Sequence, residues 1–120
     1  MIVAFANYLL KRMRKKAMTN EEFMLEVEKS FIRSKKLLLK KEKEYSGGRD
    51  RLIQFYKTGV MENKQPTETL FSMADKHISS IADMVANPEK YTLRQWNSKV
   101  TDLRNYTFLL DALLRDMGIE

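Results

Sequence analysis

The fold is decided by residues 92–118, TLRQWNSKVTDLRNYTFLLDALLRDMG. The stretch opens on Thr92 with Gln95 three positions later, the spacing of a capping box, in which two side chains satisfy backbone N–H groups at a helix start. Gly118 stands at its end, and glycine commonly ends helices because it accepts left-handed backbone geometry. Between these signals, apolar side chains recur at helical spacing: Leu93, Trp96, Val100, Leu103, Tyr106, Leu110, Leu113 and Met117. We therefore predict one long amphipathic helix over residues 92–117.

Three further helices are predicted upstream, over residues 20–45, 49–58 and 66–86. The remaining glycines and both prolines fall at the proposed ends of these helices: Gly47, Gly48, Gly59, Pro66 and Pro88. No window alternates apolar and polar residues for long enough to form a convincing strand. The predicted fold class is therefore all-α: an antiparallel helical bundle of four main helices plus an N-terminal helical extension.

Length and composition indicate one small globular domain. The chain has 120 residues, of which 43% are hydrophobic and 32% charged, and a chain of this length buries about two-thirds of its unfolded surface. It contains no cysteine, which excludes disulfides, thiolate zinc sites and a cysteine nucleophile. A single histidine leaves little scope for a zinc enzyme.

The net charge of +6 is concentrated at one end of the chain. From Met18 onward, 17 basic residues face 16 acidic ones, so the main domain is close to neutral. The first 17 residues contain no acid and five bases: Lys11, Arg12, Arg14, Lys15 and Lys16. Duplex nucleic acid needs a basic stripe on the folded domain, and none is evident, so no duplex partner is expected.

Residues 1–17 form a segment distinct from the main domain, residues 18–120. Its apolar run precedes its basic residues, the reverse of a signal peptide, and is too short to span a membrane. Three interpretations stay open: a helix that docks on the domain or a second subunit, an extension upstream of a start at Met18, or an interfacial membrane anchor. Thr19 and Glu22 have capping-box spacing, which favours an independent helix start just after Met18.

Polar residues on or beside the apolar stripes predict a ligand site, because bundle proteins build sites from side chains between facing helices. If the helices pack antiparallel, ten residues converge on one pocket: Lys41, Glu44, Tyr45, Arg49, Asp50, Lys76, His77, Asp102, Asn105 and Tyr106. Structural alternatives stay open for several of them. His77 fits a satisfied core residue, Asp102 fits a partner for Lys99 or Arg104, and Lys41 fits a solvated helix end. No catalytic residue and no metal ligand is assigned, and the phosphate-binding Walker pattern is absent.

Three blocks in order carry a family resemblance: KEKEY at 41–45 followed by Asp50 and Phe55, MADKHI at 73–78, and KVTDLRNY at 99–106. Together they resemble small phage proteins of the nucleotide modification associated domain type. That group is similar, more distantly, to all-α nucleoside triphosphate pyrophosphatases of the MazG and dimeric dUTPase kind. The resemblance covers roughly residues 20–117 and implies a protein that binds or acts on a nucleotide during phage infection, in the cytoplasm of a bacterial host.

The same resemblance argues against pyrophosphatase activity. Those enzymes hold magnesium with a pair of glutamates one turn apart and a Glu-x-x-Asp on a later helix. The first helix here offers Glu21, Glu22 and Glu26, but Lys99 stands where the acid ahead of Asp102 would be. Divalent ions prefer several carboxylate oxygens, so no cofactor is expected, with magnesium relevant only if the protein is an enzyme.

The function expected from the sequence is binding of a nucleotide, cyclic nucleotide or similar phosphorylated ligand by a homo-oligomer, for modification or sequestration. Lys41, Arg49 and Lys76 would contact phosphate, His77 and Asp102 would orient polar groups, and one of the site's two tyrosines would stack on the base. The alternative is a helical protein-interaction module, such as a phage inhibitor of a host defence protein. A second alternative is a weak magnesium-dependent pyrophosphatase.

Overall fold

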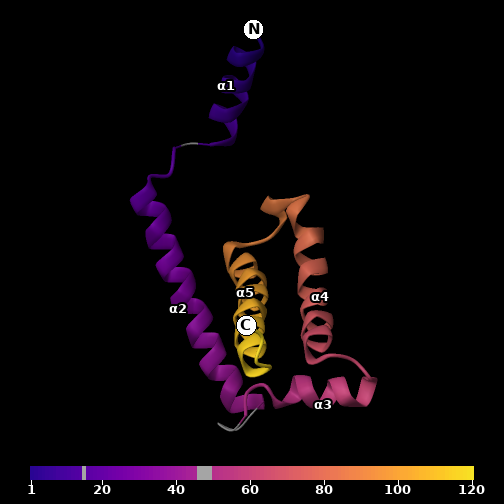
Figure 1. Cartoon of the computed structure of the whole chain (residues 1–120). Coiled ribbons are helices and arrows are strands. Elements are labelled where there is room, and N and C mark those ends of the chain that lie inside the picture. The colour runs from indigo at the N-terminus through magenta and orange to yellow at the C-terminus, as the bar shows by residue number, and fades with distance from the viewer. Residues whose placement is uncertain (15, 46–49) are drawn as a thin grey trace. The chain divides into compact units, whose positions relative to one another are not determined.

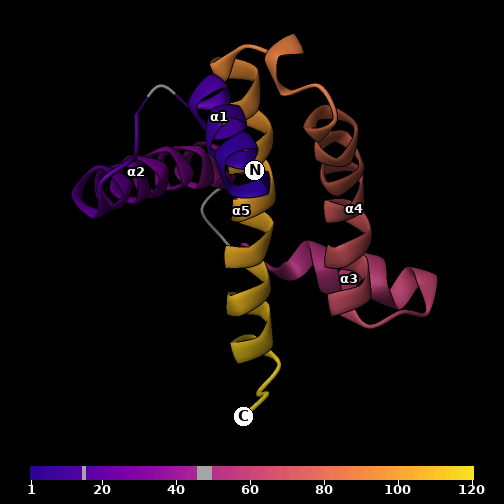
Figure 2. The same ribbon diagram turned by 90° about the horizontal axis from the view of Figure 1, so that it is seen from above.

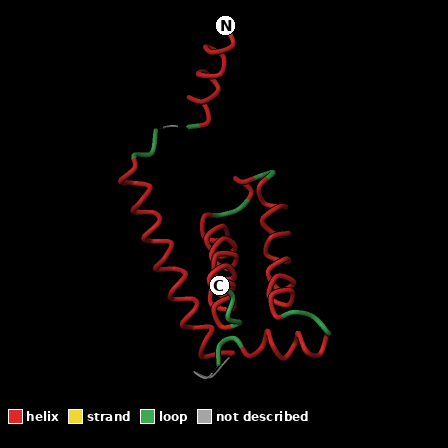
Figure 3. Tube along the Cα trace, in the orientation of Figure 1, coloured by secondary structure: helices red, strands yellow, loops and turns green. Residues whose placement is uncertain are grey.

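Every regular element that the structure describes is helical (Figures 1 and 3). The structure is a computed structural model and describes residues 1–14, 16–45 and 50–120. Its elements are α1 (Ile2–Met13), α2 (Asn20–Tyr45), α3 (Ile53–Glu62), α4 (Pro66–Val85), the short 3-10 helix η1 (Pro88–Lys90) and α5 (Leu93–Asp116). The all-α prediction is thus confirmed for the described residues.

The chain divides into two compact units, and the division falls within α2. The N-terminal unit comprises Met1–Ser30 and the C-terminal unit Phe31–Glu120. None of the helices within the described ranges is long and apolar enough to cross a membrane.

The N-terminal unit contains α1 and the start of α2. No residue of α1 is buried. The start of α2 lies where the sequence predicts it, because the Thr19 hydroxyl accepts a hydrogen bond from the Glu22 backbone N–H at 3.1 Å. The same hydroxyl lies 3.2 Å from Glu22 Oε1 and donates to it. The first of these bonds satisfies one of the backbone donors that every helix start leaves without an intrahelical partner.

The core of the C-terminal unit forms between α3, α4 and α5. The helices α4 and α5 run antiparallel and side by side, with α3 lying across the start of α4 (Figures 1 and 2). Phe55, Leu70 and Leu113 meet at the centre, one from each helix. Partly buried apolar side chains surround this centre: Leu52, Tyr56, Met73, Tyr106, Leu109, Leu110 and Met117.

Capping signals in the sequence position α4 and α5 correctly. Thr92 Oγ1 accepts a hydrogen bond from the Gln95 N–H at 3.1 Å, and Gln95 Oε1 accepts one from the Thr92 N–H at 2.8 Å. This is the predicted capping box. A second box, which the sequence analysis did not identify, opens α4 through Gln65 and Glu68. The apolar stripe of α5 contributes to the core unevenly, since Leu113 is fully buried whereas Leu93 is 75% exposed.

The predicted position of the second main helix, residues 49–58, was wrong. The observed helix α3 spans Ile53–Glu62, because Gly59 lies inside it rather than ending it. Gly59 is buried, and a Cβ there would lie 2.8 Å from the Lys64 carbonyl oxygen, so glycine is required by the close approach of the following turn. Asn63 ends the helix instead, with a left-handed φ of 55°. The predicted stop at Gly47 and Gly48 lies outside the described residues.

Candidate functional site

Three of the ten predicted site residues meet between α4 and α5. His77 Nδ1 lies 3.8 Å from Asp102 Oδ2. The ring centroids of His77 and Tyr106 are 5.3 Å apart, and the two ring planes are tilted by 37°. The side chains of His77 and Asp102 retain 20% and 28% of their solvent exposure. We call these three residues the imidazole cluster.

The helices bring the imidazole cluster together by simple spacing. Asp102 and Tyr106 are four residues apart on α5, so they occupy the same face of that helix one turn apart. His77 projects from α4, which packs antiparallel to α5. The cluster lies near Ala74, a small buried residue one turn before His77. The sequence suggested Lys99 or Arg104 as a partner for Asp102, whereas the structure places His77 beside it.

The geometry leaves hydrogen-bonding capacity on the imidazole. Hydrogen bonds from N–H to oxygen usually span 2.7–3.2 Å, and the 3.8 Å between His77 and Asp102 exceeds that range. The contact is an ion pair when the imidazole is protonated. Because neither imidazole nitrogen is held by a hydrogen bond to Asp102, the cluster can bind a polar or anionic group.

Lys76 and Asn105 flank the cluster in the sequence but differ in surroundings. Lys76 is exposed on α4. Asn105 is only 6% exposed, and its Nδ2 donates to the Ser34 backbone oxygen at 3.3 Å. Its Oδ1 is buried without a hydrogen-bond partner among the described residues. Asn105 thus links α5 to α2 within the C-terminal unit, a structural use that the sequence analysis did not foresee.

The remaining predicted site residues make local contacts or lie outside the described part. Lys41 Nζ lies 4.0 Å from Glu44 Oε2, near the end of α2. Asp50 Oδ1 accepts a hydrogen bond from the Leu52 N–H at 3.0 Å, just before α3. The side chain of Tyr45 and the whole of Arg49 lie outside the described residues.

A basic pair near Ser34 was missed by the sequence analysis. Arg104 Nη1 donates to the Ser34 hydroxyl at 3.0 Å, and Ser34 itself is buried. Partial burial lowers the pKa of Arg104, and the charge of nearby Arg33 lowers it further. Ser34 and Arg33 lie on α2 and Arg104 on α5, so the hydrogen bond between Arg104 and Ser34 joins two helices of the C-terminal unit. A serine among apolar neighbours on a predicted helix was the only sequence signal for this contact.

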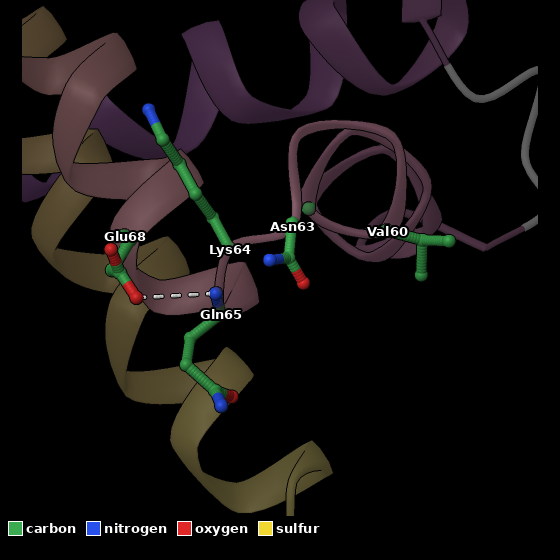
Figure 4. A pocket seen from close by; sticks show the side chains of 6 residues that line it. Val60, Asn63, Lys64, Gln65 and Glu68 are labelled. Atoms are coloured by element: carbon green, nitrogen blue, oxygen red, sulfur yellow. Dashed lines mark hydrogen bonds between the residues drawn. The ribbon is translucent and has the colours of Figure 1, made fainter.

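An open hollow of about 370 Å³ lies at the turn between α3 and α4 (Figure 4). Its polar groups already serve the turn, since Glu68 Oε1 accepts from the Gln65 N–H at 3.3 Å and Lys64 Nζ lies 3.5 Å from Glu62 Oε2. The hollow is lined by Gly59, Val60, Asn63, Lys64, Gln65 and Glu68. None of these belongs to the predicted ligand site, and the lining offers no nucleophile or general base pair.

The acids considered for magnesium do not form a site. Within the described ranges no group of three or more histidine, aspartate or glutamate side chains is placed to hold a metal ion. Glu22 lies 3.6 Å from Lys16 Nζ, and Glu26 lies 3.7 Å from Lys29 Nζ. Because each of these carboxylates faces a lysine, this donor set does not fit a divalent ion.

No protein-family model, no curated protein and no solved structure matches this chain.

Proposed function

We propose that the C-terminal unit binds a nucleotide or a similar phosphorylated ligand at the imidazole cluster. The observation that carries the proposal is a half-buried imidazole set beside a carboxylate and an aromatic ring, at a distance that leaves its hydrogen bonds available. Lone core histidines normally have their nitrogens satisfied, because a buried polar group without a partner is costly. Because His77 keeps a fifth of its exposure and forms no hydrogen bond to Asp102, a ligand can reach it and supply such a partner.

Each group of the cluster suits a different part of such a ligand. The His77 imidazole can donate a hydrogen bond to phosphate oxygens, and the exposed Lys76, which precedes it in the sequence, supplies positive charge. The Asp102 carboxylate accepts hydrogen bonds, as from sugar hydroxyls or base N–H groups. The Tyr106 ring offers an apolar surface of the kind on which bases stack, and such stacking contributes about 1–3 kcal/mol per base.

A thermal-shift screen tests this proposal. The full chain is heated with nucleoside mono-, di- and triphosphates and with cyclic dinucleotides, each with and without magnesium. A ligand at 100 times its Kd adds about 2.7 kcal/mol of stability. For a domain of this size, that raises Tm by roughly 10 to 20 °C.

Matched variants make the screen specific to the cluster. The double variant Lys76→Gln/His77→Gln should lose the ligand-induced shift, whereas Lys57→Gln, which removes an exposed charge on α3, should keep it. No shift with any member of the panel, or an equal shift in the double variant, contradicts the proposal.

We further propose that α2 completes a bundle of four main helices by packing against α5, antiparallel as α4 and α5 are, while α3 crosses the start of α4 (Figure 1). Three contacts within the C-terminal unit support it. The ring centroids of Phe31 on α2 and Phe108 on α5 are 6.0 Å apart, and Ser34 receives hydrogen bonds from Arg104 and Asn105. Disulfide trapping of cysteine pairs at these positions would test the arrangement, which is wrong if no pair cross-links.

The second candidate function is a helical interaction module, such as a phage inhibitor of a host defence protein acting in the bacterial cytoplasm. Large apolar side chains that remain exposed in the C-terminal unit favour it, among them Val60, Met61 and Phe71. Such groups are common at protein interfaces, including those of homo-oligomers. Size measurement in solution tests the oligomer, and Phe71→Ser should then shift the protein towards the monomer while Ser72→Ala should not.

The pyrophosphatase alternative predicts magnesium-dependent release of pyrophosphate that Asp102→Ala abolishes. The acids present do not fit a magnesium site, so we derive no catalytic step through the metal.

A further inference from the structure

The helix α1 is amphipathic and carries positive charge without negative charge. At about 100° of rotation per residue, its large apolar side chains fall within one arc of about 160°. This apolar face comprises Ile2, Val3, Phe5, Leu9, Leu10 and Met13. The remaining surface carries Asn7 and Lys11, with Arg12 at the edge of the apolar face. Two more basic residues, Arg14 and Lys16, come after the end of the helix. We call residues 2–16 without Lys15 the basic amphipathic segment.

The segment leaves both of its faces to solvent. No residue of α1 is buried, and the apolar face includes Phe5, Leu9 and Met13, all exposed. Tyr8 lies under the guanidinium of Arg12, whose Cζ is 5.9 Å from the ring centroid. This contact joins an aromatic ring to a cation at the edge of the apolar face, an arrangement suited to a boundary between apolar and aqueous phases.

We propose that the basic amphipathic segment binds the surface of an anionic lipid bilayer. A helix with apolar residues on one face and lysine or arginine on the other lies in the plane of the membrane interface. Twelve residues of helix are too few to span a bilayer, which needs about 20, so the helix lies on the membrane and does not cross it. The C-terminal unit, which carries the proposed ligand site, would thereby be held near that surface.

Charge favours lipid over a second copy of this chain as the occupant. Four cations are described in the segment and the first 17 residues contain no acid; of the four, Lys16 lies 3.6 Å from Glu22. Two copies packed through this segment would bring like charges together, which opposes association. An anionic surface neutralises the same charges, and each lysine or arginine near it strengthens binding about fivefold.

Vesicle co-sedimentation of the full chain tests the proposal. We expect binding to vesicles of mixed phosphatidylserine and phosphatidylcholine, and little binding to phosphatidylcholine alone. Binding should weaken as salt rises from 0.05 to about 0.5 M, because the electrostatic part is screened over a few ångströms at high ionic strength. Equal binding to both lipids contradicts the electrostatic argument, and absence of binding to either overturns the proposal.

Two variants separate the contributions of charge and apolar area. Lys11→Gln/Arg12→Gln should lower the partition coefficient about 25-fold, whereas the charge-matched control Lys35→Gln/Lys36→Gln, on exposed residues of α2, should leave it unchanged. Phe5→Ser/Leu9→Ser should lower the partition coefficient at least about tenfold, because it removes large apolar side chains that the membrane would bury. The Tm of each variant is measured in parallel to confirm that the C-terminal unit stays folded.

A second measurement distinguishes a lipid surface from another copy of the chain as the partner of the apolar face. If light scattering shows an oligomer that Phe5→Ser/Leu9→Ser dissociates while vesicle binding is absent, the apolar face is covered by another copy and the lipid proposal is wrong. If vesicle binding is lost in that variant while the oligomeric state is unchanged, the lipid proposal is supported.

Discussion

Replacing Leu113 with alanine tests whether the core lies where α3, α4 and α5 meet. Leu113 is 0% exposed and packs with Phe55 and Leu70, one residue from each of the other two helices. Three separate helices surround the side chain, so the backbone cannot easily close the space that the substitution leaves. Fully buried leucines of this kind lose about 2.7–5.0 kcal/mol on truncation to alanine.

The size of this loss is large relative to the stability of such a domain. The C-terminal unit runs from Phe31 to Glu120, and domains gain about 0.05–0.15 kcal/mol of stability per residue, which gives roughly 5 to 13 kcal/mol here. Leu113→Ala should therefore remove between about a fifth and all of the free energy of unfolding. We expect Tm to fall by at least about 10 °C.

The matched control is the same substitution in the same helix at an exposed position. Leu93 is 75% exposed in the first turn of α5, so Leu93→Ala should change stability by less than about 0.5 kcal/mol. Urea unfolding followed by circular dichroism at 222 nm measures both variants against the parent chain. Equal effects of the two substitutions, or a loss below about 1 kcal/mol for Leu113→Ala, would refute this placement of the core.

Three further predictions concern the turns and one titrating group. The Tyr56 hydroxyl donates to Asp116 Oδ2 at 2.7 Å, and this bond is the main cause that raises the pKa of Tyr56 above 10.0. The folded chain holds the phenol proton to higher pH than the unfolded chain, so the free energy of unfolding should fall above about pH 10 as Tyr56 ionises. Urea titrations at pH 9 to about 11.5 should show a smaller fall for the Tyr56→Phe variant than for the parent chain. Thr92→Ala removes the cap of α5 and should cost about 1 kcal/mol by the same unfolding measurement, while Thr92→Ser should restore it. Gly59→Ala should destabilise, since its Cβ would lie 2.8 Å from the Lys64 carbonyl oxygen; a gain in Tm, which alanine normally gives within a helix, would contradict that close approach.

The parts of the fold that the sequence predicted are those fixed by local chemistry. Both ends of α5 follow from Thr92 and from the apolar stripe, and α4 follows from Pro66, which suits a first turn. The position of α3 was mispredicted because Gly59 serves a tertiary purpose. A glycine that ends a helix and a glycine that admits a neighbouring carbonyl look identical in sequence, and only the approach of the following turn separates them.

For the candidate site, too, the sequence indicated some features and not others. Of the polar residues predicted for the pocket, His77, Asp102 and Asn105 are partly or fully buried, whereas Glu44, Asp50 and Lys76 are exposed. The pattern could not show which of them already have partners. The acceptor for Asn105 is a backbone oxygen of Ser34, some 70 residues away in the chain, and no spacing within a helix predicts such a contact.

The hydrogen bonding of Asn105 can be compared with that of His77. Both are polar, both lie between packed helices, and both satisfied the same sequence criterion. Asn105 uses its Nδ2 in a hydrogen bond of 3.3 Å to a fixed backbone acceptor, so its contribution is to join two helices. His77 faces Asp102 at 3.8 Å, too far for a hydrogen bond, and retains a fifth of its exposure. His77 therefore keeps nitrogens that no hydrogen bond to Asp102 occupies, and it is through its exposed part that the proposed ligand would bond to them.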